Sequence, residues 1–319
     1  MRWIIGFFAV LTAAVAGLFA IPPTPETDFE TMLSRYGGAQ ARFARTEDGL
    51  QVHYRDQGFA EGPAIVFVHG SSASLHTWEP LVARLGDRYR LISYDQPGHG
   101  LTGEHPDNDY TAQGMIEALD AVVATAGLDH FVLVGNSMGG WVSWRYALKN
   151  PDRLAGLVLV DAAGAPLPEG VEAPGNLAFT LLQNPLGRRA LDRWTPRPLV
   201  AMSVRQSVAV KGIVTDDMVD RYWELVRLPA NKRAAVLRAT VDREPVFADR
   251  LPEIATPTLI IWGREDALIP IEAADVFKER IAGSELVVYD GVGHLPMEEA
   301  PDEVAALLDD WIQREASRR

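Results

Sequence analysis

The chain of 319 residues contains no cysteine. Disulfides, thiolate catalysis and cysteine-ligated metals are therefore excluded, and so is a lipoprotein attachment site. Positive charge is also scarce, because 30 lysines and arginines stand against 43 aspartates and glutamates and leave a net charge of −13 at pH 7. A surface of that sign repels a phosphate backbone, so we expect no nucleic-acid partner.

Charge is absent altogether from residues 3–21, which read WIIGFFAVLTAAVAGLFAI. A membrane-spanning helix needs about 20 apolar residues, so we predict that residues 1–22 anchor the chain in a membrane and that residues 23–39 form an extended linker. Arg2 before the run and the acids after it favour a body outside the cytoplasm. The alternatives are a buried core helix or a cleaved signal peptide with secretion, since Ala14-Val15-Ala16 resembles a cleavage site.

Beyond residue 40, apolar runs of strand length alternate with segments of helical length. The strand-like runs cover residues 51–55, 64–68, 91–94, 131–134, 157–160, 258–262 and 286–289, and the helix-length segments cover 77–86, 111–126, 138–149, 272–282 and 301–315. This alternation predicts an α/β fold with a mainly parallel sheet covered on both faces. Residues 165–250 show helical patterns without a buried strand, and we interpret them as a helical insertion between two parts of the core, 40–164 and 251–319.

A serine stands between two glycines where the run at 131–134 meets the helical segment at 138–149. The stretch Gly135-Asn-Ser137-Met-Gly139 matches the G-x-S-x-G nucleophile elbow. The turn is so tight that its neighbours must lack side chains, and the following helix points its free N–H groups at the site. We therefore predict that Ser137 is a catalytic nucleophile.

A serine hydroxyl needs a base to take its proton, and a carboxylate to orient that base. Of the seven histidines, only His294 follows the last strand-like run, and in this type of fold the base comes last along the chain. Asp266 follows the run before it and is the predicted orienting acid, with Asp161 as the alternative. The order is then Ser137, Asp266, His294.

The oxyanion of a tetrahedral intermediate needs at least two N–H donors. The backbone of Met138, directly after the nucleophile, is the first predicted donor. The loop His69-Gly-Ser-Ser, after the run at 64–68, supplies the second, with Ser71 as the first choice and Ser72 as the other. Gly70 in this loop permits a close backbone approach.

With these pieces in order, the chain resembles the α/β-hydrolase family from about residue 40 to the C-terminus. The matching segments are HGSS at 69–72, DQPGHG at 95–100, GNSMGG at 135–140, WGREDALIP at 262–270 and GHLPMEEAP at 293–301. The resemblance implies an eight-stranded, mostly parallel sheet with a helical cap, here 165–250, between strands six and seven. It also implies that Asp95 and His99 shape a turn near the site. The family's epoxide hydrolases and haloalkane dehalogenases carry Asp at the position of Ser137, which argues against both activities.

The expected activity is that of a serine hydrolase acting on carboxylic esters of small molecules or lipids, through an acyl-enzyme and with no cofactor or metal. The enzymatic rival is a carbon–carbon hydrolase of the meta-cleavage type, in which GNSMGG is common. Those relatives usually have Trp where Leu295 follows the histidine, and they need a cation for a substrate carboxylate. The candidate cations are Arg188, Arg189, Arg193, Arg197 and Arg205. A non-enzymatic receptor for a small ligand is the third alternative.

We expect the substrate pocket between the sheet and the cap. Its predicted walls are Trp78, Trp141, Leu295 and, from the cap, Phe179 or Trp194. For each of these residues a place in the core is the alternative interpretation, since large apolar side chains fill cores as readily as pockets.

Overall fold

The structure is a computed structural model, and it describes residues 22–172, 175–241 and 245–318. Its centre is an eight-stranded sheet in the order β1-β2-β4-β3-β5-β6-β7-β8. Strand β2 pairs antiparallel with β1 and β4, and the other neighbours pair in parallel. The strands are β1 Arg42–Arg45, β2 Gln51–Gly58, β3 Ala64–Val68, β4 Arg90–Tyr94, β5 Phe131–Asn136, β6 Leu154–Val160, β7 Thr258–Gly263 and β8 Glu285–Tyr289. The predicted α/β fold with a mostly parallel sheet is confirmed.

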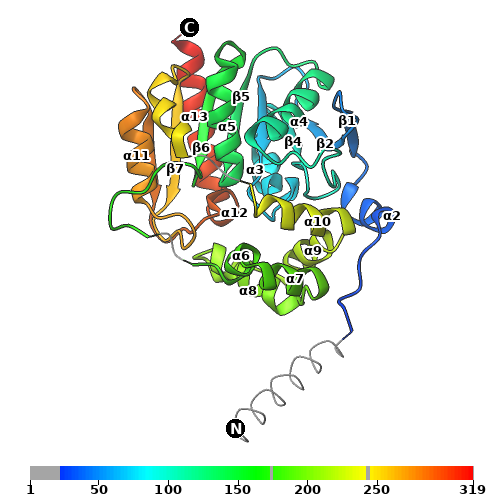
Figure 1. Cartoon of the computed structure of the whole chain (residues 1–319). Coiled ribbons are helices and arrows are strands. Elements are labelled where there is room, and N and C mark those ends of the chain that lie inside the picture. The colour runs from blue at the N-terminus through cyan, green and yellow to red at the C-terminus, as the bar shows by residue number, and fades with distance from the viewer. Residues whose placement is uncertain (1–21, 173–174, 242–244, 319) are drawn as a thin grey trace, which may run out of the picture.

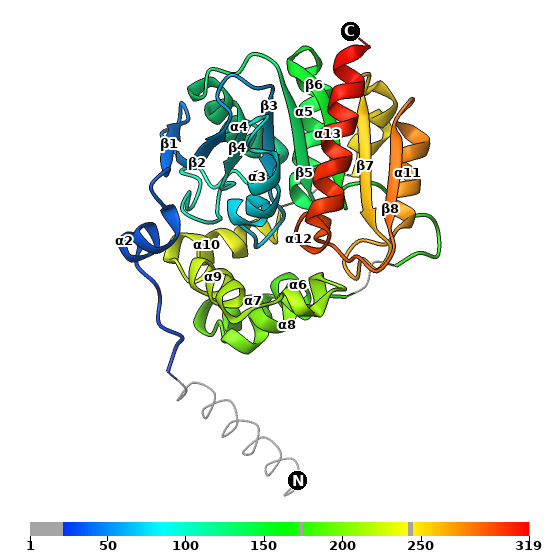
Figure 2. The same ribbon diagram turned by 180° about the vertical axis from the view of Figure 1, so that it is seen from behind.

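Helices cover both faces of the sheet (Figures 1 and 2). On one face lie α4 (Ala112–Thr125), α5 (Met138–Lys149) and α11 (Glu272–Arg280), and on the other lie α3 (Glu79–Leu85) and α13 (Pro301–Ser317). Successive side chains of β3 enter opposite layers, Val66 and Val68 the first and Ile65 and Phe67 the second. A strand buried on both faces must be apolar throughout, which is why this run was visible in the sequence.

Five helices fold into a cap between β6 and β7, as the sequence predicted, and they lie together across one end of the sheet (Figure 1). They are α6 Leu177–Gln183, α7 Pro185–Arg193, α8 Arg197–Ser207, α9 Asp216–Val226 and α10 Pro229–Arg238. Asparagine side chains cap the N-termini of α6 and α7. Asn176 accepts from the N–H groups of Ala178 and Phe179, and Asn184 accepts from those of Leu186 and Gly187. The 3-10 helix Pro245–Glu253 leads back to the core.

The predicted anchor at residues 1–22 lies, except for its last residue, outside the described residues. Within the described part of the chain, no helix is both long enough and apolar enough to cross a membrane. Residues 23–39, predicted as an extended linker, contain the short helix α2 (Phe29–Met32) and the π-helical turn Leu33–Gly37. Met32 is buried there against Leu225 and Leu228 of the cap region. The segment therefore departs from the linker prediction by packing on the folded domain.

Candidate active site

The turn between β5 and α5 holds Ser137 in a rare backbone conformation, with φ 54° and ψ −120°. The glycines around it explain how the turn closes. A Cβ on Gly135 would lie 2.3 Å from the carbonyl oxygen of Gly139, and one on Gly139 would lie 2.1 Å from that of Val68. Any side chain at these positions would clash with backbone, so the G-x-S-x-G spacing is a steric requirement of this strand–turn–helix geometry.

Asp266 and His294 meet across a buried hydrogen bond. Nδ1 of His294 donates to Oδ2 of Asp266 at 2.7 Å. The other carboxylate oxygen accepts from the N–H groups of Leu268 and Ile269, at 2.7 and 3.1 Å, which fixes the carboxylate plane. With its proton held on Nδ1, the imidazole has Nε2 available as an acceptor, which is the tautomer that a general base requires.

The residue before the nucleophile ties the histidine loop to the elbow. Asn136 is buried, and its Nδ2 donates to the carbonyl oxygens of Val160 and His294, each at 3.1 Å. Ser137 and His294 line the same cavity. Asn136 was not recognised from the sequence, although a polar side chain at the end of a fully buried strand was the available signal.

The predicted oxyanion donors line the same cavity as Ser137, since Ser71, Ser72 and Met138 are among its lining residues. Met138 is the first residue of α5, so its N–H has no partner within the helix. The loop carrying Ser71 is held by His69, whose Nδ1 donates to the carbonyl oxygen of Gly70 at 2.7 Å while its Nε2 accepts from the N–H of Gln96 at 3.0 Å. Burial lowers the pKa of His69, so its imidazole stays neutral and keeps both roles.

The family model described as "alpha/beta hydrolase fold" matches residues 63–301, which include every one of these site residues. The chain belongs to the α/β-hydrolase family.

Two curated members of the α/β-hydrolase family show the range of its chemistry. A 2-hydroxy-6-oxononadienedioate/2-hydroxy-6-oxononatrienedioate hydrolase of Pseudomonas putida is 29% identical over 288 residues, which cover 86% of this chain and 97% of that one. A monoacylglycerol lipase of Bos taurus is 28% identical over 284 residues, covering 86% and 82%. Among solved structures, a thermophilic esterase from Thermogutta terrifontis superposes with a TM-score of 0.72 at 27% identity, covering 87% and 99%.

In this α/β hydrolase the alternative acid Asp161 lies close to the Asp–His pair without replacing Asp266. One ligand atom each from Asp161, Asp266 and His294 lie within 4.8 Å of one another. Oδ1 of Asp161 accepts from the N–H of Gly263 at 3.0 Å. Burial, and then the charge of Asp266, raise the pKa of the Asp161 carboxyl well above its usual value, so it favours its neutral form. Two carboxylates and an imidazole could hold a divalent cation, but Nδ1 of His294 and Oδ2 of Asp266 are already bonded to each other.

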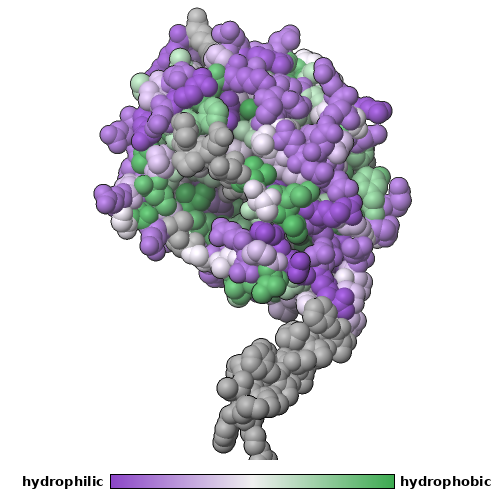
Figure 3. Space-filling view, in the orientation of Figure 1, coloured by the Kyte–Doolittle hydropathy of each residue, from purple (hydrophilic) through white to green (hydrophobic). Residues whose placement is uncertain are grey.

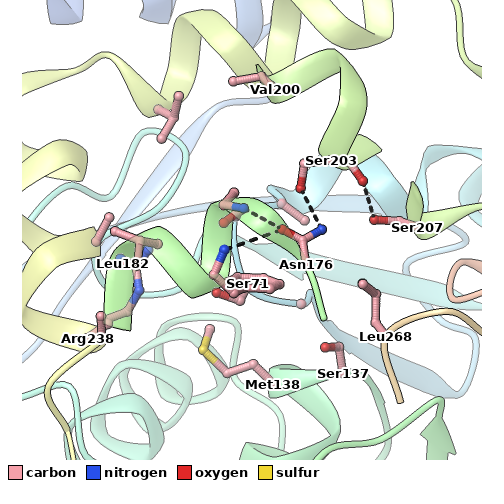
Figure 4. A pocket seen from close by; sticks show the side chains of 18 of the residues that line it. Ser71, Ser137, Met138, Asn176, Leu182, Val200, Ser203, Ser207, Arg238 and Leu268 are labelled. Carbon is pink, nitrogen blue, oxygen red and sulfur yellow. Dashed lines mark hydrogen bonds between the residues drawn. The ribbon is translucent and has the colours of Figure 1, made fainter. Parts of the chain in front are cut away.

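The cavity between the sheet and the cap has a volume of about 740 Å³. Ser137 and Met138 lie on the core side, and the cap supplies Val200, Ser203 and Ser207 from α8 (Figure 4). The predicted walls Leu295 and Phe179 line the cavity.

Three other predicted walls are not among the residues that line the cavity. Trp78 is fully buried and stacks on Phe67 at 4.9 Å between ring centroids. Trp141 is buried in α5, and Trp194 donates its indole N–H to the carbonyl oxygen of Pro22. The five candidate arginines of the cap do not line the cavity either. Among the described residues, the arginine that lines it is Arg238 of α10, which is buried and donates to the carbonyl oxygen of Gly98 at 2.7 Å.

Glu299 joins the histidine loop to the cap. Its Oε1 accepts from the N–H groups of Gly293 and Leu295, on either side of His294, at 3.0 and 3.2 Å. Its Oε2 accepts from those of Ala209 and Val210, just beyond α8, at 2.7 and 2.9 Å. The N–H of His294 also donates to the carbonyl oxygen of Ser207, the last residue of α8, at 2.8 Å. The role of Glu299 was missed in the sequence because two of its partners, Ala209 and Val210, are backbone groups about 90 residues away along the chain.

Proposed function

We propose that this α/β hydrolase is a serine hydrolase of carboxylic esters. The observation that carries the proposal is the buried hydrogen bond between Asp266 and His294 beside the elbow serine, in one cavity with Ser137. This is the set of groups that acyl transfer requires: a nucleophile, a base with the correct tautomer and an orienting carboxylate.

In the proposed reaction, Ser137 Oγ attacks the acyl carbon while Nε2 of His294 takes its proton. The N–H groups of Met138 and Ser71 stabilise the oxyanion, each contributing about 3 kcal/mol to the lowering of the barrier. The tetrahedral intermediate collapses as His294 returns the proton to the leaving alcohol, which leaves Ser137 acylated. Water, deprotonated by His294, then attacks the acyl-enzyme and releases the acid.

The cavity supports an acyl substrate of moderate size. Its volume of about 740 Å³ falls within the range of about 300–1,000 Å³ typical of small-molecule pockets. The side chains of Phe179, Leu182, Leu191, Leu199 and Val204 give it an extensive apolar lining. An uncharged acyl chain, of a simple ester or of a lipid, gains free energy by leaving water for such a lining.

Arg238 favours a second candidate, hydrolysis of a carbon–carbon bond in a dienol acid. That substrate carries a carboxylate, and Arg238 is a buried cation on the cavity wall. The Pseudomonas putida relative is named for such a reaction. Two features favour the ester: apolar Leu295 follows His294 in the cavity, and the guanidinium already donates to Gly98.

The two candidates are separated by measuring kcat/KM side by side for p-nitrophenyl esters of two to twelve carbons and for a 2-hydroxy-6-oxo-dienoate. We expect many turnovers of the esters per protein molecule and negligible cleavage of the dienoate. A dienoate preference of a hundredfold or more would reject the ester proposal. A single slow turnover of every substrate would favour the small-ligand receptor.

We also propose that residues 1–22 anchor the enzyme in a membrane with its body outside the cytoplasm, on the strength of the uncharged run at 3–21. An anchored chain stays in the membrane fraction through a carbonate wash. Edman sequencing of a mature protein that begins after Ala16 would identify a cleaved signal peptide and a secreted enzyme instead.

A further inference from the structure

Exposed apolar side chains gather on one part of the cap. The segment 177–211, comprising α6, α7, α8 and the turn after them, is called here the outer cap layer. Of the six large hydrophobic side chains exposed in the described residues, four belong to it, and the other two are Phe29 and Phe59. The four are Leu177, Leu186, Met202 and Val210, and Leu186 is 73% exposed. Hydrophobic surface is visible along the lower edge of the molecule in Figure 3, where Figure 1 places these helices.

The helices of this layer are apolar on both sides. In α8, Met202 and Arg205 are exposed three residues apart, while Val200 and Val204 line the cavity. In α7, Leu186 and Arg189 are exposed at the same spacing, while Leu191 lines the cavity. Residues three apart share a helix face. The outer face of a surface helix is normally polar. Exposed leucine and methionine on the outer faces of α7 and α8 therefore indicate that these faces contact an apolar surface outside the molecule, in addition to the cavity on their inner side.

The same layer is basic in an acidic protein. Residues 177–211 contain six lysines and arginines and one acid, Asp192, although the whole chain has a net charge of −13. Arg197 pairs with Asp216 and Asp220 of α9. Arg189, Arg205 and Lys211 are exposed. Apolar side chains interspersed with cations are typical of surfaces that bind anionic lipid.

The chain also enters the fold at this layer. The N–H of Thr24 donates to the carbonyl oxygen of Arg193 at 3.0 Å, and the N–H of Thr195 donates to Oγ1 of Thr24 at 3.0 Å. Together with the bond from the Trp194 indole to Pro22, these contacts fasten the chain to the C-terminal end of α7, directly after the apolar run at 3–21. This step rests on the anchor proposed above: if that run enters a bilayer, α7 is held against the same bilayer.

We infer that the outer cap layer docks on the surface of a bilayer containing anionic phospholipid. Leu177, Leu186, Met202 and Val210 enter the interface, where burial of apolar area is favourable, and the nearby Lys and Arg side chains are attracted to anionic headgroups. The cavity then lies directly behind the helices that contact lipid.

The absence of cysteine allows a direct test with the full chain. Leu186→Cys and Met202→Cys each create one labelling position for an environment-sensitive fluorophore. Phe59→Cys is the matched control, since Phe59 is 48% exposed and bonds to Tyr89 beside the start of β4, at the sheet edge opposite to the cap. Each labelled protein is mixed with vesicles of phosphatidylcholine, with or without phosphatidylglycerol, that carry nitroxide-labelled acyl chains.

We expect severalfold quenching at positions 186 and 202 with phosphatidylglycerol present, and none at position 59. Arg189→Glu combined with Arg205→Glu lowers the quenching at 186 severalfold while the melting temperature stays unchanged. Flotation of the chain with vesicles but no quenching at 186 and 202 would overturn the docking surface and leave the anchor intact. Equal quenching in neutral vesicles would overturn the choice of an anionic surface, and equal quenching at 59 would overturn the orientation. Ester turnover in solution is measured separately and depends on none of these results.

Discussion

Replacement of Glu299 by alanine removes one carboxylate that holds the backbone on both sides of His294, the proposed base. Four backbone N–H groups lose their acceptor, and two of them, at Gly293 and Leu295, are buried. Hydrogen bonds to charged groups contribute about 1.5–3 kcal/mol each. Since water can replace the acceptor at the more exposed Ala209 and Val210, we count the two buried bonds and expect the free energy of unfolding to fall by about 3–6 kcal/mol.

The larger expected effect of this substitution is on kcat. Without Glu299, the loop 293–295 keeps the bond of His294 to Asp266 and the backbone bonds of His294 to Ser207 and Asn136. None of these bonds holds the N–H groups of Gly293 and Leu295, and a displacement of about 1 Å at a reacting group costs about 100-fold. We therefore expect Glu299→Ala to lower kcat for a p-nitrophenyl ester by about 100-fold with little change in KM, because Glu299 does not line the cavity. Glu299→Gln keeps one oxygen acceptor and recovers part of the rate.

The matched control is Glu303→Ala, which removes an exposed glutamate from α13 on the same C-terminal segment. We expect its kcat and melting temperature to equal those of the unmodified protein. A folded Glu299→Ala protein, judged by circular dichroism, with kcat within twofold of the unmodified enzyme would refute the argument that Glu299 positions His294.

Three further substitutions test the interior of the site. Asp266→Asn, which disturbs the tautomer of His294, should lower kcat by about 10⁴-fold, and a loss below tenfold in steady-state ester assays would assign the orienting role elsewhere. Asn136→Ala removes the donor to His294 and Val160, so chemical denaturation should show a loss of about 1–3 kcal/mol together with a lower kcat. Asp161→Asn should keep its activity, because burial and the charge of Asp266 raise the pKa of Asp161 and favour its neutral form, which the amide resembles. The folded protein holds that proton at pH values where the unfolded chain, with a pKa near 4, has released it. Stability of the unmodified enzyme therefore falls relative to Asp161→Asn as pH rises above about 4, and a difference in melting temperature that is constant between pH 4 and 9 would contradict this.

The strands that were predicted correctly are those in which burial requires an apolar side chain at almost every position. The runs at β3, β5 and β7 are apolar at nearly every position because both faces are covered. Strand β1, Arg42–Arg45, was not predicted, because it is a short edge strand with charged residues at both ends and has no apolar run. That Ser137, Asp266 and His294 lie near one another was predictable, because each follows a strand and parallel strands bring their carboxyl ends to one side of the sheet.

Side-chain direction and long-range backbone contacts could not be predicted from the sequence. Trp78 and Trp141 are large apolar residues of the kind that line pockets, but their side chains point into the core. The direction of a side chain depends on how its helix packs, which the sequence does not show. Arg238 lines the cavity, and the five arginines expected there do not. Arg189 and Arg205 are exposed, and Arg197 pairs with acids of α9. The contacts of Glu299 join segments that no local pattern connects.

The most direct test of the account is covalent labelling of Ser137. A fluorophosphonate probe should modify the full chain once, on the peptide that contains Ser137, and mass spectrometry of the digest locates it. Ser137→Ala should lose the label and reduce ester turnover by up to about 10⁶-fold, leaving only the contribution of the oxyanion donors. Retention of labelling at another residue in a Ser137→Ala protein with undiminished ester turnover would contradict the assignment of Ser137 as the nucleophile.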